Sequence, residues 1–176
     1  QLGNILNTKK KQKFNIPIII IGNVVAGGAG KTPTVISLAN KLINSNIKVH
    51  IILKGYKSAA KKSIQVNTKI HTYKDVGDEA IICSKIAPTW VGKSRIASIN
   101  NATNNDADLV ILDDGLQDSR IESDLNILVF SGLQGIGNGR IIPSGPMREH
   151  LSKAVDKSDL AIIIEEDDNN IKELIS

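Results

Sequence analysis

A glycine-rich turn between an aliphatic run and an amphipathic segment constrains this chain more than any other feature. Residues 16–21 form a short aliphatic stretch, which is typical of a strand buried on both faces. Residues 22–33 follow, with the sequence Gly-Asn-Val-Val-Ala-Gly-Gly-Ala-Gly-Lys-Thr-Pro. Apolar residues then recur at helical spacing from Val35 to Ile43. A strand, a glycine-rich loop and a helix in this order form the context that a phosphate-binding P-loop requires.

The residue types of this loop suit the phosphates of a nucleotide. Glycines let backbone N–H groups point at phosphate oxygens, and the helix N-terminus adds a favourable dipole. Lys31 can bridge the β- and γ-phosphates, and the Thr32 hydroxyl can ligate Mg²⁺. We expect the loop to bind ATP through the following residues: Val25, Ala26, Gly27, Gly28, Ala29, Gly30, Lys31 and Thr32. The strict P-loop pattern has glycine in place of Val25, so a glycine-rich turn without a ligand is the alternative.

The rest of the chain alternates between strand and helix patterns. Further strands are predicted over residues 49–53, 89–91, 109–112, 127–130 and 160–164. Further helices are predicted over residues 78–86, 93–101 and 147–155. The basic segment 54–74 is expected to carry loops and a short hairpin. This alternation predicts an α/β fold with a mainly parallel sheet flanked by helices, of the P-loop NTPase type.

Composition supports this fold and limits the partners. Aromatic residues are only 3% of the 176 residues, so the core must be aliphatic, which favours α/β packing. The net charge of +4 fits an anionic ligand or membrane surface but does not by itself imply nucleic acid, and we expect none. The single cysteine, Cys83, excludes an intrachain disulfide. We expect a monomer.

A second acidic element supports the P-loop interpretation. The aliphatic residues 109–112 lead directly into Asp113 and Asp114. Ligands of open α/β sheets bind at the carboxyl ends of the strands. Two carboxylates at such an end can hold Mg²⁺ directly or through water. The sequence therefore predicts a metal site composed of Thr32, Asp113 and Asp114.

Five sequence blocks together resemble the tetraacyldisaccharide 4′-kinase family, the lipid A 4′-kinases. They are Ile-Ile-Ile-Gly-Asn at 19–23, Ala-Gly-Gly-Ala-Gly-Lys-Thr-Pro at 26–33, Val-Gly-Asp-Glu at 76–79, Asp-Asp-Gly-Leu-Gln at 113–117, and Gly-Asn-Gly-Arg at 137–140 with Pro-Ser-Gly-Pro-Met-Arg-Glu at 143–149. The P-loop is generic, but the Asp-Asp-Gly-Leu-Gln and Gly-Pro-Met-Arg-Glu blocks are specific. Val25 is itself usual for this family.

The resemblance implies a peripheral enzyme on the cytoplasmic face of the bacterial inner membrane. Such an enzyme uses MgATP to phosphorylate the 4′-hydroxyl of a tetraacylated glucosamine disaccharide 1-phosphate. Asp78 matches the family's general base, beside Lys31 as the second catalytic residue. An N-cap at the start of a helix is the alternative role for Asp78. The resemblance also implies the following supporting residues: Glu79, Arg95, Arg148 and Glu149.

The chain departs from the family pattern at several places. Asp118 stands where the family usually has histidine, and Lys54 where it usually has arginine. Lysine keeps the charge but loses bidentate phosphate geometry. The expected organisation is a basic lead-in over residues 1–15 and a P-loop kinase domain over 16–176. The family's C-terminal lobe, a histidine that assists the base and an N-terminal membrane helix are expected to be missing.

Two other functions are compatible with the same loop. Partitioning-type switch ATPases share a Gly-Gly-x-Gly-Lys-Thr loop, but they carry a signature lysine where this chain has Ala26. A nucleotide-binding fragment without catalysis is the second alternative, because Asp118 and the missing lobe would both weaken an active site.

Overall fold

The computed structural model describes residues 11–55 and 62–176. Within them, seven strands form one sheet: β1 Ile18–Gly22, β2 Val49–Lys54, β3 Ile64–Gln65, β4 Thr89–Gly92, β5 Leu109–Asp113, β6 Leu125–Ser131 and β7 Leu160–Ile164. The helices are α1 Lys31–Asn44, α2 Tyr73–Val76, α3 Asp78–Ser84, α4 Arg95–Asn104, α5 Leu151–Asp156 and α6 Ile171–Leu174. The strand order is β3-β4-β2-β5-β1-β6-β7, and every neighbouring pair is parallel except β3 with β4. The mainly parallel α/β fold is therefore confirmed.

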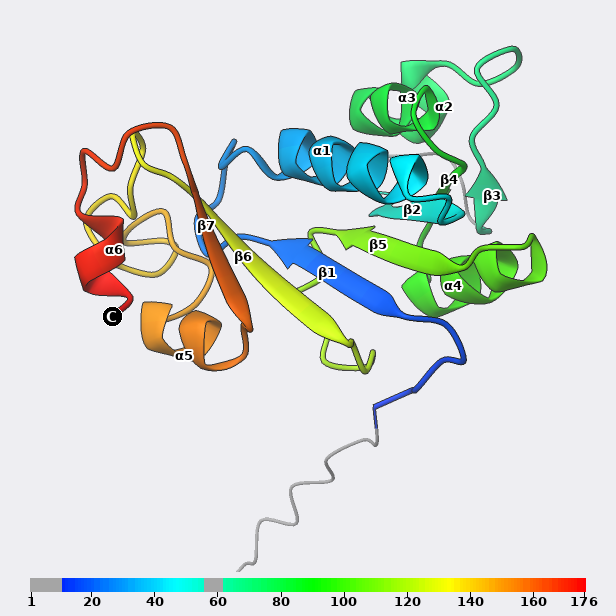
Figure 1. Cartoon of the computed structure of the whole chain (residues 1–176). Helices are drawn as coiled ribbons and strands as arrows, with labels where there is room; N and C mark the ends of the chain where they lie inside the picture. Colours follow the sequence, from blue (N-terminus) through cyan, green and yellow to red (C-terminus); the bar gives the residue numbers. More distant parts are fainter. Residues whose placement is uncertain (1–10, 56–61) are drawn as a thin grey trace, which may run out of the picture.

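The central strand β1 lies between two separate cores. Its even-numbered residues Ile18 and Ile20 belong to the core that includes residues of α4, α5 and α6, whereas Ile19 and Ile21 belong to the core that includes residues of α1, α2 and α3. Figure 1 shows α1 and α3 on one face of the sheet and α4 on the other. An aliphatic run without polar alternation is required because both faces of this strand are buried.

The predicted strands and three of the predicted helices are present, with ends that shift by up to a few residues. The helix predicted over 147–155 begins only at Leu151, so its first four residues were assigned wrongly. Met147 instead forms isolated β-bridges with Val25 and Ile141. The backbone at this position bonds to distant segments, which a helical hydrogen-bond pattern would exclude.

The basic region after β2 also differs from its prediction. In place of a local hairpin, β3 pairs antiparallel with β4. The short helix α2 follows with a capping box between Thr72 and Asp75. Residues 56–61 of the predicted loop region lie outside the described part of the chain.

The basic lead-in is not wholly free of the domain. Its residues 1–10 lie outside the described part, but Gln12 forms a parallel bridge with Ile121. The Gln12 N–H donates to the Arg120 carbonyl (2.8 Å), and the Glu122 N–H donates to the Gln12 carbonyl (2.9 Å). The backbone around Arg120 is therefore fixed from the N-terminal side.

The buried His50 and Trp90 side chains make the fold sensitive to acid. The indole N–H donates to His50 Nδ1 at 3.1 Å, so the bond requires a neutral imidazole acceptor. Burial lowers the pKa of His50 from its ordinary value, although the Asp106 and Asp108 carboxylates oppose the shift. The unfolded chain therefore takes up a proton that the folded protein resists, and stability falls as the pH drops below about 6.5.

We predict that His50→Gln weakens this acid sensitivity, because the amide oxygen can still accept from the indole but does not titrate. The measurement is urea unfolding at pH 7.5 and pH 5.5, followed by the emission of Trp90, the only tryptophan. Wild-type protein should lose more stability over this interval than the variant. Equal losses in both proteins would contradict the assignment.

Candidate functional site

The P-loop connects the end of β1 to the start of α1, as the sequence predicts. Gly30 precedes the helix with φ of 77°, a left-handed conformation that favours glycine. A Cβ at Gly30 would also clash with the Ile164 side chain. At Gly28 a Cβ would meet no described atom within 4 Å, so this part of the loop is open for a ligand. The N-terminus of a long helix, α1, thus opens onto the loop, as anion binding requires.

Val25 has a structural reason for replacing glycine. Its side chain is buried, and its backbone forms an antiparallel bridge with Met147. The Ala26 N–H donates to the Pro146 carbonyl, and the Arg148 N–H donates to the Val24 carbonyl, both at 2.7 Å. The loop is extended and paired here, so no glycine conformation is needed.

Lys31 is held at the bottom of the site before any ligand arrives. Its Nζ donates to Asn23 Oδ1 at 3.0 Å and lies 3.6 Å from Asp114 Oδ1. The fully buried Asn23 is itself oriented by donating to the Val25 carbonyl at 2.5 Å. Sequence analysis missed this role of Asn23, although a polar residue directly after an aliphatic strand was a usable signal.

One pocket of about 570 Å³ brings together six of the predicted site residues. It is lined by Gly27, Lys31, Leu53, Lys54, Glu79, Asp113, Asp114 and Arg148. The ends of the neighbouring strands β2 and β5 contribute Lys54 and Asp113 to it. This central pocket therefore lies at the carboxyl edge of the sheet, where α/β proteins bind ligands.

Asp113 is the most perturbed carboxyl of the central pocket. Its Oδ1 is buried and has no hydrogen-bond partner within the described residues. Burial, together with the charges of Glu79 and Asp114, raises the pKa of Asp113 to about 6 against the opposing charges of Lys31 and Arg95. Such a group is poised to gain from a cation, because ionisation in isolation is costly.

Asp114 is in the opposite electrostatic state. It has φ of 57°, and its two oxygens accept from Arg148 Nη1 at 2.7 and 2.8 Å. Burial alone would raise the pKa of Asp114, but the Arg148 hydrogen bonds and the Lys31 charge bring it below its ordinary value. Asp114 is therefore an ionised partner of two cations.

The oxygens at this site fit Mg²⁺ only in part. Within residues 11–55 and 62–176, no cluster of three or more His, Cys, Asp or Glu side chains could hold a metal ion alone. Mg²⁺ normally keeps several waters and binds through one or two carboxylates together with substrate phosphates. The unpartnered Asp113 oxygen and the half-buried Thr32 in the first turn of α1 suit that arrangement.

Arg95 stabilises the backbone at Asp113 and Asp114, which we call the acidic turn. Its Nη2 donates to the backbone carbonyls of Asp114 (2.5 Å) and Asp113 (3.4 Å). Its Nη1 lies 3.5 Å from the Asp118 carboxylate, and both side chains are only 6% exposed. Asp118, the departure from the family pattern, thus pairs with arginine and not with the P-loop.

The remaining predicted residues lie around the central pocket. Asp78 is the first residue of α3 and Gly77 is the N-cap, so the N-cap role for Asp78 is wrong. Asp78 lines a neighbouring pocket of about 470 Å³, and Glu79 lines both pockets. Glu149 accepts from Gln117 and Lys157, which makes it a brace of the adjacent loops.

We predict that Asp113→Asn stabilises the nucleotide-free protein at pH 8. The folded protein keeps the Asp113 carboxyl protonated up to pH about 6, whereas the unfolded chain loses this proton at the ordinary pKa of 3.8. The protonated carboxyl therefore favours the folded state at low pH, and this contribution to stability is lost as the pH rises from about 4 to about 6. The gain should be on the order of 1–3 kcal/mol at pH 8. Urea unfolding in EDTA would measure it. A stability difference between variant and wild type that does not shrink at pH 4.5 would contradict the prediction.

Comparisons with known proteins identify the family of this chain. A family model described as Tetraacyldisaccharide-1-P 4′-kinase matches residues 4–175. The tetraacyldisaccharide 4′-kinase of Jannaschia sp. (strain CCS1) is 41% identical over 159 residues, which cover 90% of this chain and 48% of the relative. The tetraacyldisaccharide 4′-kinase of Parvibaculum lavamentivorans is 40% identical over 152 residues, which cover 86% of this chain and 44% of the relative.

A solved structure has a similar fold. It is a crystal structure of LpxK from Aquifex aeolicus, described as an "apo" form in complex with ATP, at 29% identity and a TM-score of 0.77. The match covers 88% of this chain and 50% of that chain. The chain thus spans about half the length of the relatives it matches. By the match of its family model, this chain belongs to the tetraacyldisaccharide-1-P 4′-kinase family.

Proposed function

We propose that this chain forms the ATP-binding and catalytic part of a kinase that phosphorylates the 4′-hydroxyl of a tetraacylated glucosamine disaccharide 1-phosphate. One observation carries the proposal: the central pocket above Lys31 shares Leu53, Lys54 and Glu79 with the pocket that contains Asp78. A phosphate donor and an acceptor hydroxyl can therefore lie in adjoining spaces.

The donor side follows from the loop and the acidic turn. P-loop amides and Lys31 bind the ATP phosphates, while Asp113 and Thr32 hold Mg²⁺. When bound, Mg²⁺ neutralises charge on the phosphates. Arg148 and Lys31 keep Asp114 ionised and in place. These residues position the γ-phosphate, which is most of what phosphoryl transfer needs from a protein.

The acceptor side depends on Asp78. It is exposed at the start of α3, where a sugar hydroxyl can reach it. The hydroxyl oxygen bonds to the γ-phosphorus, the bond from that phosphorus to the bridging oxygen of ADP breaks, and Asp78 accepts the hydroxyl proton. A carboxylate that accepts this proton is the usual arrangement in kinases.

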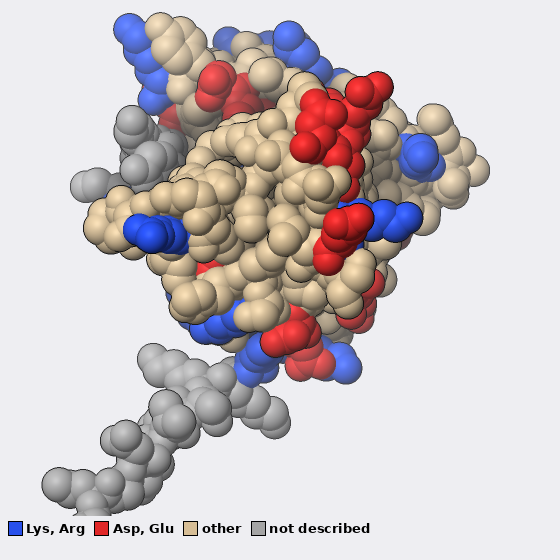
Figure 2. Space-filling view, turned by 90° about the vertical axis from the view of Figure 1, so that its left-hand side faces the viewer, with Lys and Arg blue, Asp and Glu red and all other residues tan. Residues whose placement is uncertain are grey.

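The acceptor is a lipid, so the protein must work at a membrane surface. No helix in the described ranges is long and apolar enough to cross a bilayer. Figure 2 shows acidic and basic side chains around an uncharged centre on one face of the molecule. Peripheral contact with the cytoplasmic face of the inner membrane, as a monomer, is the arrangement we propose.

Lys31→Ala should abolish phosphate transfer to the disaccharide. Losing the amine that contacts the phosphates should lower kcat at least about 100-fold. Lys41→Ala on the exposed side of the same helix is the matched control and should keep wild-type activity. The measurement is transfer of ³²P from ATP to the lipid by the protein in its full natural length. If the wild-type protein transfers no phosphate to the lipid, the proposed function is wrong.

Asp78→Asn should lower kcat roughly 100-fold and leave ATP affinity largely unchanged. The amide cannot accept the hydroxyl proton, but Asp78 lines the acceptor-side pocket and not the central one. Steady-state kinetics and ATP titration by calorimetry separate the two effects, with the exposed Asp156→Asn as control. A large loss of ATP binding in Asp78→Asn would overturn its assignment as the base.

A further inference from the structure

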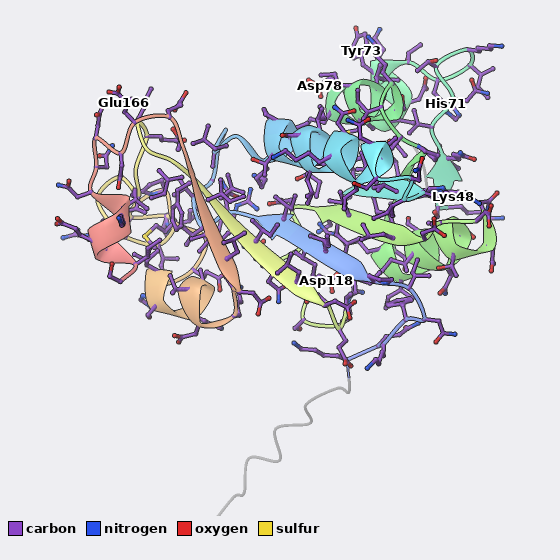
Figure 3. The ribbon with its side chains drawn as sticks, viewed as in Figure 1. Lys48, His71, Tyr73, Asp78, Asp118 and Glu166 are labelled. Carbon is purple, nitrogen blue, oxygen red and sulfur yellow. The ribbon has the colours of Figure 1, made fainter. Side chains whose placement is uncertain are left out.

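A second pocket of about 390 Å³ adjoins the central one, and Asp78 is not among the residues that line it. It shares Lys54, Asp114 and Arg148 with the central pocket. Figure 3 shows Asp78 beside α3 and Asp118 on the opposite side of the sheet. The two pockets therefore form a continuous space around the carboxyl end of β5, and we call the second one the arginine pocket.

The arginine pocket carries an excess of positive charge. Four cationic side chains line it, against the two carboxylates Asp114 and Asp118: Lys54, Arg95, Arg120 and Arg148. Since both carboxylates already pair with arginines, the remaining charge favours an added anion.

Arg95 supplies an unused donor in this pocket. Its side chain is 6% exposed, and its Nε has no hydrogen-bond partner in the described part of the chain. Its Nη1 and Nη2 face Asp118 and the backbone carbonyls of the acidic turn. A buried donor without a partner costs free energy, so the protein's own groups do not fully satisfy the Arg95 guanidinium.

Arg120 completes the pocket from the solvent side. Its Nε and Nη2 donate to the two oxygens of Asp118 at 2.8 and 2.7 Å, a fork that holds the guanidinium in one orientation. The backbone bridge from Gln12 fixes the same segment. The Arg120 side chain is still 56% exposed, so part of it remains accessible to a ligand from solvent.

We infer that the arginine pocket binds a phosphomonoester, and that this group is the 1-phosphate of the disaccharide acceptor. The inference rests on the proposed function, since the family description names an acceptor that already carries a 1-phosphate. With the reacting hydroxyl near Asp78, the other end of the acceptor extends across the carboxyl edge of the sheet toward Arg95 and Arg120. Arginine is the side chain best suited to a phosphate at that end.

The direct test compares two acceptors, with and without the 1-phosphate, in the protein of full natural length. In Arg120→Ala, KM for the phosphorylated acceptor should rise roughly tenfold, because a charged hydrogen-bonding partner is lost. KM for the dephosphorylated acceptor and for ATP should stay unchanged. Arg140→Ala, an exposed arginine outside this pocket, is the matched control and should change neither.

Several outcomes would overturn the inference. An equal rise in KM for both acceptors in Arg120→Ala would mean that Arg120 does not bind the 1-phosphate. A raised KM for ATP would assign the pocket to the nucleotide. If wild-type protein transfers no phosphate to either acceptor, the proposed function itself is wrong. If Arg120→Ala still transfers phosphate and its preference between the two acceptors is unchanged, only the assignment of the arginine pocket to the 1-phosphate is wrong.

Asp118→Asn gives a second readout that does not depend on turnover. Asparagine keeps the shape but removes the charge that competes for Arg95 and Arg120. With saturating ADP on the P-loop, inorganic phosphate should therefore raise the melting temperature of Asp118→Asn more than that of wild type. A merely structural role for Asp118 would lower the stability of the variant without this added response. An equal or smaller response to phosphate would contradict the inference.

Discussion

The backbone pairing between residues 24–26 and 146–148 is the contact on which the site depends. It holds the first half of the P-loop extended through the Ala26 and Arg148 amides, 122 residues apart along the sequence. It also delivers the Arg148 side chain to Asp114, which in turn lies against Lys31. A single backbone connection thus fixes both the shape of the loop and the charges that face it.

The two neighbouring aspartates show how this arrangement separates their roles. Arg148 and Lys31 stabilise the charge of Asp114, whereas Asp113 is buried with an oxygen left without a partner. Asp113 therefore costs stability in the empty protein and gains from a bound cation. A buried carboxylate that lowers the stability of the empty protein is expected at a ligand-binding site, whereas it would have no purpose in a hydrophobic core.

Much of the fold could be predicted because its signals are local. The aliphatic strands, the glycine-rich turn and the Asp113–Asp114 pair each sit within one continuous segment, and all are where they were expected. The errors arise from long-range pairing. Met147 bridges Val25 instead of starting a helix, and β3 pairs with β4 instead of a local strand. Asn23 and Arg120 were missed for another reason: their side-chain partners are near in sequence, but only the fold shows that Asn23 accepts from Lys31 and that Arg120 lines a pocket with Arg95.

Asp118 illustrates why a departure from a family pattern needs the structure to interpret it. From the sequence, a third acidic residue after Asp113 and Asp114 would be expected to disturb a metal or nucleotide. In the structure its charge is balanced by two arginines, and hydrogen bonds from Arg120 lower the pKa of Asp118 despite its burial. The carboxylate is thereby kept away from the phosphate loop. Asp118 instead holds two guanidinium groups of the arginine pocket and neutralises part of their charge, so its direct contacts lie in that pocket and not on the P-loop.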